Sequence, residues 1–572
     1  MGYRLYVLSK LFNKLRTTED VVINAGIVIF VIATFVASLW NVDAYHEGAL
    51  FPSAVGISDG LSIFREVNNQ YGFIGPLLNS PWLAIFGPHL VVSRIFSFLV
   101  ICIIAYMLYL NAQLFISQNA AKIAALLWIG ISPVWSYVFT SKSLSGGTWP
   151  NHYAVLLILF MTFILFRQSY PPSSRSVFFA GSFCFLSSQA RMEFIAVWVL
   201  CTLVILVTQK ILRRAWILGS LSAALVTFLY LFLNNSLRDW FEQTYLVWTM
   251  SAPDVPTIGL GFFISNGLNF IMLAFIGLFV CLLDNFLLKN HLKPALRVGL
   301  ITIIFLFIAS IEGVIPETIT IAERNLSPYL SFAAYRSLFS YVNLAILISL
   351  WIIFSQLLSH SRKRTIKSEY ILDFQNLILV ACCLGIFGVF HNTNADYTSI
   401  TIAPFILLIV KNRNEVNMRV FHQYLSTLKY VVIPSLLITS LFLFINQVPQ
   451  HRFEYSTSTL RGLFAQTQAD RDRLDSLFGV IEKYTTPRRT YMDCQTGLLT
   501  VGPKGYIGKD QWSWNQQPAQ MLRGRFSNLE SGESIIACHI NAEDKALFES
   551  LTKSKKISSV FSNSDLVIYV VN

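Results

Sequence analysis

The chain has 572 residues, of which 54% are hydrophobic and only 13% are charged, and its formal net charge is +12. Soluble globular proteins carry about 25% charged residues, so this composition excludes that class and favours a polytopic membrane protein. The positive charge needs no nucleic acid partner, because basic loops that face anionic lipid account for it.

Apolar runs that could cross about 30 Å of hydrocarbon as helices recur through the first 446 residues. We expect about thirteen transmembrane helices, at 21–40, 89–110, 121–138, 152–166, 176–190, 194–209, 216–233, 262–283, 298–311, 338–358, 371–390, 398–410 and 428–446. The first run is longer than the core of a signal peptide and lacks a small-residue cleavage site. We therefore expect it to remain as the first helix.

The distribution of Lys and Arg predicts the orientation, since these residues tend to stay on the cytoplasmic side. With the N-terminus inside, 21 of the 28 Lys and Arg residues in positions 1–446 fall on cytoplasmic segments. The segments 41–88, 234–261 and 312–337 then form long outer loops. The first of these, called the first outer loop below, is predicted to contain amphipathic helices that lie on the membrane surface.

After Asn446 the composition changes to ordinary polarity, with strand-like runs such as 534–538 and 565–571. We therefore divide the chain into a transmembrane domain, 1–446, and an exported α/β or α+β domain, 447–572. Six cysteines lie in apolar runs and are expected to be small core residues. Cys494 and Cys538 are the two in the exported domain and are the candidates for a disulfide.

The stretch WNVDAYHEG, residues 40–48, places Asp43, His46 and Glu47 directly after the first predicted helix. A carboxylate at the end of a membrane helix is held near the level of the lipid headgroups. That is where a general base must lie to act on a substrate whose phosphate is attached to a lipid. The alternative is that these side chains are ordinary polar residues at the membrane interface.

The order of residues that follows resembles the first outer loop of type C glycosyltransferases. Asp43, His46 and Glu47 are followed by Arg65-Glu66, Tyr71-Gly72 and Gly75-Pro76. The resemblance covers roughly residues 20–110 well and the remainder as an architecture. It implies a polytopic enzyme that uses a polyprenyl-phosphate sugar, with Asp43 as the catalytic base and Glu47 or Glu66 as the alternatives. A late outer loop keeps Asp396, whereas Asn394 stands where relatives have Arg.

The departing phosphate of such a donor needs cations, and Arg binds phosphate through paired hydrogen bonds. The candidates are outward-facing arginines: Arg191, Arg324, Arg336 and Arg65. Arg191 interrupts an apolar stretch, which favours a functional role; a structural ion pair with Glu193 is the alternative. Further candidate substrate contacts are His46, Tyr71, Glu193, His391, Asp396, Trp512 and Trp514.

Together with the resemblance, these features predict a glycosyltransferase of the bacterial inner membrane that passes a sugar from a polyprenyl-phosphate donor to a cell-envelope glycan or lipid. The resemblance implies that the reaction inverts the anomeric configuration. The alternative is a transporter or flippase, or a polymerase or ligase, of lipid-linked sugars. No P-loop, Rossmann fingerprint or Cys/His ligand spacing is present, so we expect no cofactor. A divalent metal held by His391 and Asp396 is an alternative.

Overall fold

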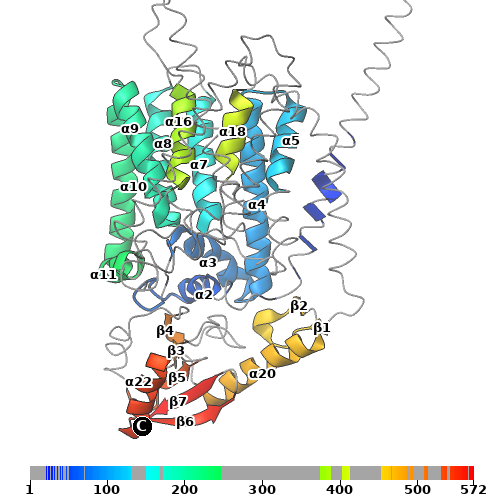
Figure 1. Cartoon of the computed structure of the whole chain (residues 1–572), viewed down its shortest axis with the longest axis vertical. Helices are drawn as coiled ribbons and strands as arrows, with labels where there is room; N and C mark the ends of the chain where they lie inside the picture. The colour runs from blue at the N-terminus through cyan, green and yellow to red at the C-terminus, as the bar shows by residue number, and fades with distance from the viewer. Residues whose placement is uncertain are drawn as a thin grey trace, which may run out of the picture.

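The computed structural model is a bundle of helices with a small sheet domain at one end (Figure 1). It describes residues 50–67, 69, 71–129, 150–167, 172–246, 374–387, 402–412, 453–465, 467–485, 490–493, 508–512, 530–537, 542–554, 556–563 and 566–572, with isolated positions between 21 and 47. The predicted spans 262–283, 298–311, 338–358 and 428–446 lie outside the described residues.

Eight predicted spans contain a helix of the structure. These helices are α4 (Leu90–Gln113), α5 (Gln118–Ile129), α7 (Pro150–Phe166), α8 (Ser174–Ala190), α9 (Ile195–Thr208), α10 (Arg213–Leu233), α16 (Phe374–Phe387) and α18 (Ala403–Lys411). Among the described helices, α4 and α10 are long and apolar enough to cross a membrane, and the other apolar helices are shorter. The mostly helical fold is thus confirmed, while the count of thirteen spans stays a prediction.

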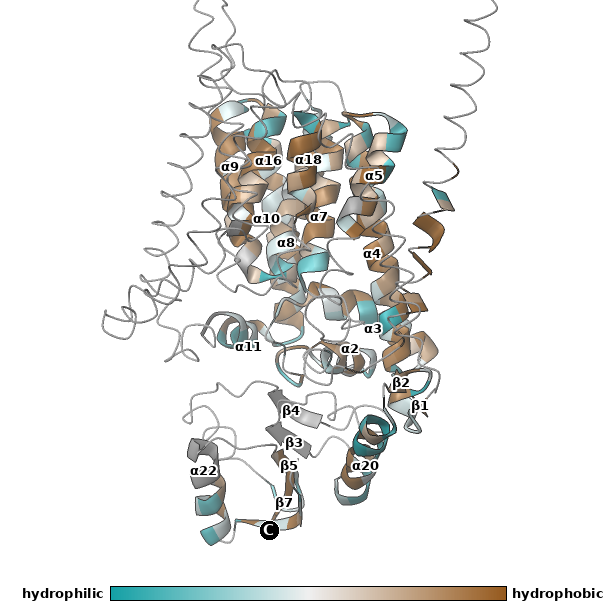
Figure 2. Ribbon diagram, turned by 45° about the vertical axis from the view of Figure 1, so that its right-hand side comes forward, coloured by the Kyte–Doolittle hydropathy of each residue, from teal (hydrophilic) through white to brown (hydrophobic). Residues whose placement is uncertain are grey.

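Helices α8 and α10 pack through small residues, as membrane helices commonly do. A Cβ on Gly219 would lie 1.9 Å from the carbonyl oxygen of Phe178, so only glycine permits this approach. The Ser182 hydroxyl donates to the carbonyl of Gly219 at 2.9 Å across the same contact. On the other side of α10, Leu221 and Leu225 are 59% and 57% exposed, and the helices are apolar around the bundle (Figure 2). Outward leucines over small inward residues fit an integral membrane protein.

Several buried polar side chains inside the bundle are paired between helices. Asn111 of α4 donates to the carbonyl of Leu159 in α7 at 3.0 Å and accepts from the Thr162 hydroxyl at 3.0 Å. Asn376 of α16 and Asn412, directly after α18, exchange two hydrogen bonds of 2.9 and 3.0 Å. Such pairs fix the register between helices where lipid-like surroundings offer no other partners.

The first outer loop contains two helices, α2 (Phe51–Ser58) and α3 (Ile74–Phe86). Helix α3 buries Gly75, Pro76, Asn79, Ser80 and Leu83. Its opposite face exposes large apolar side chains, namely Leu78, Trp82, Ile85 and Phe86. Small residues toward the protein and large apolar ones outward suit a helix that contacts lipid. Placement of the loop's helices on the membrane surface stays a prediction.

The bundle has two distinct ends. Next to α2 and α3 lie the start of α7 and the end of α8, and the exported domain lies beyond α2 and α3 (Figure 1). Lys411, at the end of α18, lies at the opposite end, where its ammonium is 5.9 Å from the Phe115 ring centre. The assignment of the basic end to the cytoplasm stays a prediction.

The C-terminal domain, which keeps the name exported domain from its predicted location, carries a five-stranded mixed sheet in the order β4-β3-β5-β7-β6. Its strands are β3 (Thr490–Asp493), β4 (Gly508–Trp512), β5 (Ser534–Ala537), β6 (Ile557–Ser562) and β7 (Val567–Val571), with helices α20 (Gln468–Tyr484) and α22 (Ala542–Lys553). Strands β4, β3 and β5 are mutually parallel, whereas β7 is antiparallel to both of its neighbours. The predicted small domain of helices and strands is therefore present.

One hydrophobic core is shared between this domain and the first outer loop. Its members from the first outer loop and the start of α4 include Phe51, Val55, Leu83 and Leu90. Those from the exported domain include Tyr455, Leu460, Leu463, Phe478 and Ile568. A short hairpin of β1 (Phe453–Glu454) and β2 (Phe464–Ala465) makes part of this contact. The exported domain is thus packed on the membrane domain through buried apolar surface.

The register of β3 and β5 bears on the predicted disulfide. Asp493 is paired with Ala537 in this parallel ladder. The residues that follow these two in the sequence are Cys494 and Cys538, which lie outside the described residues. Neighbouring strands run about 4.8 Å apart, within the Cα separations that a disulfide spans. We expect unreduced exported protein to give a linked peptide containing both cysteines by mass spectrometry. Free thiols at both positions would contradict this prediction.

Candidate active site

Arg191 lies at the break between α8 and α9 that the sequence predicted. Its backbone is extended and ends α8, and a single 3-10 turn, Met192–Phe194, leads into α9. The guanidinium Nη1 donates to Oδ1 of Asn151, in the first turn of α7, at 2.8 Å. The same guanidinium lies 5.8 Å from the ring centre of Tyr71, from the first outer loop. Three separate segments therefore meet at this half-buried cation.

The position of Tyr71 is fixed by a turn in the first outer loop. The Tyr71 N–H donates to Oδ1 of Asn69 at 3.2 Å, and Nδ2 of Asn69 donates to the carbonyl of Gly72 at 3.1 Å. Gly72 presses against the end of α8, where a Cβ would lie 1.9 Å from the carbonyl oxygen of Gln189. Glycine is required there, and it brings Tyr71 against the residue that follows α8.

A second outer segment holds the same turn. After α11 (Leu237–Phe241), Gln243 lies in a π-helical turn, Glu242–Leu246. Its Oε1 accepts from the Asn69 N–H at 3.0 Å, and its Nε2 donates to the carbonyl of Phe64. Gln243 is buried, so one amide closes two backbone groups that would otherwise be unsatisfied. The first outer loop and the segment 234–246 therefore form one layer over the bundle.

This arrangement suits an anion. Asn151 and Tyr71 are neutral, and their two contacts orient the Arg191 guanidinium. A planar guanidinium in a partly desolvated place binds phosphate more strongly than one in bulk water, since the local dielectric constant is lower. The cluster can hold a phosphate group at the end of the bundle.

Glu47 has a different role from the one expected. Its Oε1 and Oε2 accept from Nε and Nη2 of Arg94 at 2.6 and 2.7 Å, and the two side chains are 1% and 0% exposed. A carboxylate with both oxygens bonded to a buried guanidinium is poorly placed to take a proton from an acceptor. The alternative base role of Glu47 therefore does not fit its geometry, which is that of a structural ion pair.

The other described candidates are Arg65, Glu66, Glu193 and Trp512. For Glu193 and Trp512 the structure describes the backbone alone. Arg65 and Glu66 lie on an exposed turn, where Oε2 of Glu66 accepts from the Ser62 N–H at 2.7 Å. Glu193 lies in the turn directly after Arg191. Trp512 ends β4 and is paired with Asp493, at the edge where the parallel strands β3, β4 and β5 all end.

Several predicted residues lie outside the described residues. They are Asp43, His46, Arg324, Arg336, His391, Asp396 and Trp514. Within the described part of the chain no group of three or more His, Cys, Asp or Glu side chains could hold a metal ion. Sequence reasoning did not single out Asn69, Asn151 or Gln243. Asn69 and Gln243 lie in polar segments, so nothing in the sequence separates their amides from ordinary loop residues.

No family model matches the chain, and no curated protein matches it. Among solved structures, it is similar to ArnT from Cupriavidus metallidurans in the apo state, with 11% identity, 95% of this chain and 97% of that chain covered, and a TM-score of 0.44. The same protein bound to undecaprenyl phosphate gives 10% identity, 96% and 97% coverage and a TM-score of 0.35.

A third similar structure is the archaeal oligosaccharyltransferase AglB from Archaeoglobus fulgidus in complex with an inhibitory peptide and a dolichol-phosphate. It gives 11% identity, covers 96% of this chain and 74% of that chain, and has a TM-score of 0.39. Because each TM-score is below 0.5, the chemistry has to be inferred from the residues of this chain.

Proposed function

We propose that the chain is an inverting glycosyltransferase that moves a sugar from a polyprenyl-phosphate donor to a cell-envelope glycan or lipid. The donor enters from the outer leaflet of a bacterial inner membrane, with the N-terminus of the enzyme in the cytoplasm and residues 447–572 in the periplasm or outside the cell. One of the similar structures is bound to undecaprenyl phosphate and another is in complex with a dolichol-phosphate. Both compounds are polyprenyl phosphates, the class to which the leaving group of this reaction belongs.

The observation that carries the proposal is the half-buried guanidinium of Arg191. It lies at the end of the bundle nearest the amphipathic helix α3, held by Asn151 and Tyr71 from two other segments. The phosphate of a lipid-linked sugar lies at the level of the headgroups, where a helix such as α3 also lies. Arg191 is thus a cation that a lipid-linked phosphate could reach without leaving the membrane.

The reaction requires one displacement. Asp43 takes the proton of the acceptor hydroxyl, the acceptor oxygen bonds to the anomeric carbon, and the bond between that carbon and the phosphate oxygen breaks. The leaving polyprenyl phosphate gains negative charge, and Arg191 stabilises it, assisted by Arg324 and Arg336. Because the acceptor attacks from the side opposite the leaving group, the anomeric configuration is inverted.

The exported domain provides a surface for the acceptor. Strand β4 is the strand of its sheet nearest the helices in both views (Figures 1 and 2). Trp512 ends this strand, and Trp514 follows two residues later. Paired indoles suit stacking on sugar faces, so we assign the segment after β4 to contact with a glycan acceptor.

Arg191→Gln in purified full-length protein tests the phosphate role. We expect release of polyprenyl phosphate from a radiolabelled polyprenyl-phosphate sugar to fall by about 10²–10³-fold, the usual loss when one transition-state donor is removed. Arg191→Lys should recover only part of this loss, because an ammonium cannot bond bidentately. Native mass spectrometry with polyprenyl phosphate alone should show weaker binding to the Gln variant.

Arg238→Gln is the matched control, since Arg238 is an exposed outer arginine paired with Glu242 at 2.7 Å. Its turnover should equal that of the wild type. Full activity of Arg191→Gln would remove Arg191 from the mechanism. Movement of the intact lipid-linked sugar across proteoliposomes, with no cleavage of the sugar–phosphate bond, would instead establish the transporter alternative.

A further inference from the structure

Two described residues that precede Asp43 are held by the exported domain. The N–H of Phe464 in β2 donates to the carbonyl of Leu39 at 3.1 Å. Leu39 and Val42 are partly buried and pack against the core that the first outer loop shares with the exported domain. The chain is therefore fixed at the end of the first helix and again one residue before Asp43.

The chain is fixed a third time after Asp43, by α4. Glu47 is bonded to Arg94 through both oxygens in a fully buried position. Burying two charges costs several kcal/mol of desolvation that apolar side chains would avoid, so such a pair contributes orientation more than stability. A bidentate ion pair fixes the relative orientation of its two side chains, whereas an apolar contact in the same place would allow them to shift.

The exported domain also reaches this ion pair. Tyr455 is 3% exposed, and burial raises the pKa of its phenol well above its usual value while the nearby Arg94 lowers it. The phenol therefore stays neutral beside the pair. Nδ1 of His89, directly before α4, lies 2.6 Å from the carbonyl of Ser458, which joins the same segment to the start of α4.

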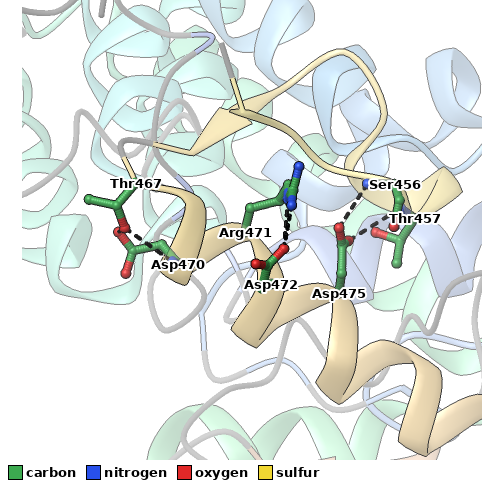
Figure 3. A network of polar contacts seen from close by, with 7 residues as sticks. All are labelled: Ser456, Thr457, Thr467, Asp470, Arg471, Asp472 and Asp475. Atoms are coloured by element: carbon green, nitrogen blue, oxygen red, sulfur yellow. Dashed lines mark hydrogen bonds and ion pairs between the residues drawn. The ribbon is translucent and has the colours of Figure 1, made fainter. Parts of the chain in front are cut away.

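Hydrogen bonds to α20 hold the segment of the exported domain that makes these contacts. Asp475 of α20 accepts from the N–H groups of Ser456 and Thr457 at 2.9 and 3.3 Å (Figure 3). The Thr467 hydroxyl accepts from the Asp470 N–H at 3.1 Å and caps the start of α20 (Figure 3). The segment that contacts α4 is therefore hydrogen-bonded to α20.

We infer that residues 453–465 of the exported domain, together with Arg94 and Glu47, are positioning residues for the catalytic base. Asp43 is four residues from Leu39 and four from Glu47, so its Cα lies within about 14 Å of both anchors, by the reach of an extended chain. Val42 shortens this tether further. The exported domain thus helps to position the catalytic base, in addition to any contact with the acceptor. This inference rests on the proposed role of Asp43.

Hydrogen–deuterium exchange on the full chain tests the positioning directly. Two variants release one side each: Glu47→Gln/Arg94→Met removes both charges and leaves none unpaired, and Phe464→Pro removes the N–H that bonds to Leu39. Between β1 and β2 the Tyr455 N–H donates to the Leu463 carbonyl, and Phe464→Pro spares this bond. We expect each variant to exchange at least about tenfold faster over residues 40–46, as for a locally opened segment.

The control is Arg238→Met/Glu242→Gln, which removes an exposed ion pair elsewhere in the outer layer. It should leave exchange over residues 40–46 unchanged. If that exchange is also unchanged in both positioning variants, the inference is overturned. Two variants at separate anchors keep the test decisive should one of them fail to fold.

Kinetics separate positioning from general damage. We expect the two positioning variants to lower kcat by about 10–100-fold, as for small displacements of a reacting group, with the donor KM changed little. Adding Asp43→Asn to either positioning variant should lower kcat no further than Asp43→Asn alone does, because both changes act through the same carboxylate. Additive losses would overturn the inference. Full activity of Asp43→Asn alone would refute the proposed base, while faster exchange over 40–46 would still support the anchoring.

Discussion

Asp43→Asn is expected to lower turnover by about 10²–10⁴-fold, the contribution of a general base, while the donor still binds. The amide is close in shape to the carboxylate but cannot accept the proton of the acceptor hydroxyl. Turnover is measured as release of polyprenyl phosphate from a radiolabelled donor by the purified full-length protein. Donor binding is measured separately by native mass spectrometry, so that a folding defect is distinguished from lost chemistry.

Asp59→Asn is the matched control, because Asp59 is an exposed carboxylate of the same loop that follows α2. It should retain wild-type turnover. If Asp43→Asn turns over normally, the base lies elsewhere, and Glu66→Gln becomes the informative variant. Glu66 is exposed, whereas Glu47 has both oxygens bonded to Arg94.

The helices were predictable because a backbone in hydrocarbon must bond internally, which makes an apolar run a helix. The predicted span 194–209 agrees with α9, Ile195–Thr208, and 216–233 lies within α10, Arg213–Leu233. Arg191 was predictable as a functional candidate for the same reason, since a cation between two apolar runs is costly without a purpose. These inferences need only local composition.

The partners of those residues were not predictable. Asn151 meets Arg191 across 40 residues, and Gln243 meets Asn69 across 174. Nothing local distinguishes an amide that closes such a contact from one that faces water. Glu47 shows the same limit: its position beside Asp43 predicts an alternative base, whereas its fate is decided by Arg94, 47 residues later.

In the exported domain, too, the strands were predictable from local sequence and the long-range contacts were not. Runs of β-branched residues at 534–538 and 565–571 predict strands, and the structure has β5 and β7 there as antiparallel neighbours. The shared core with the first outer loop was not predicted, because the apolar residues of α20 could equally face the sheet alone. Leu477, Phe478 and Ile481 instead belong to a cluster that includes Phe51 and Leu83.

Arg94→Met is expected to destabilise the protein strongly, by about 3–5 kcal/mol, because it leaves the Glu47 carboxylate buried without its partner. Glu47→Gln/Arg94→Met should be far milder, since it removes both charges from the same buried place. The measurement is thermal unfolding of the full chain in detergent, followed by intrinsic tryptophan fluorescence. The ion pair is 0% and 1% exposed, so neither solvent nor salt should screen the effect.

Arg238→Met is the control, because Arg238 is 89% exposed in its pair with Glu242 and should unfold as the wild type does. Equal destabilisation by the single and double variants would mean that the packing of the Arg94 side chain matters and its charge does not. A mild double variant that nevertheless loses turnover separates the two roles of the pair. Such a protein is stable without the ion pair, so the lost turnover reports where Glu47 holds the segment that carries Asp43.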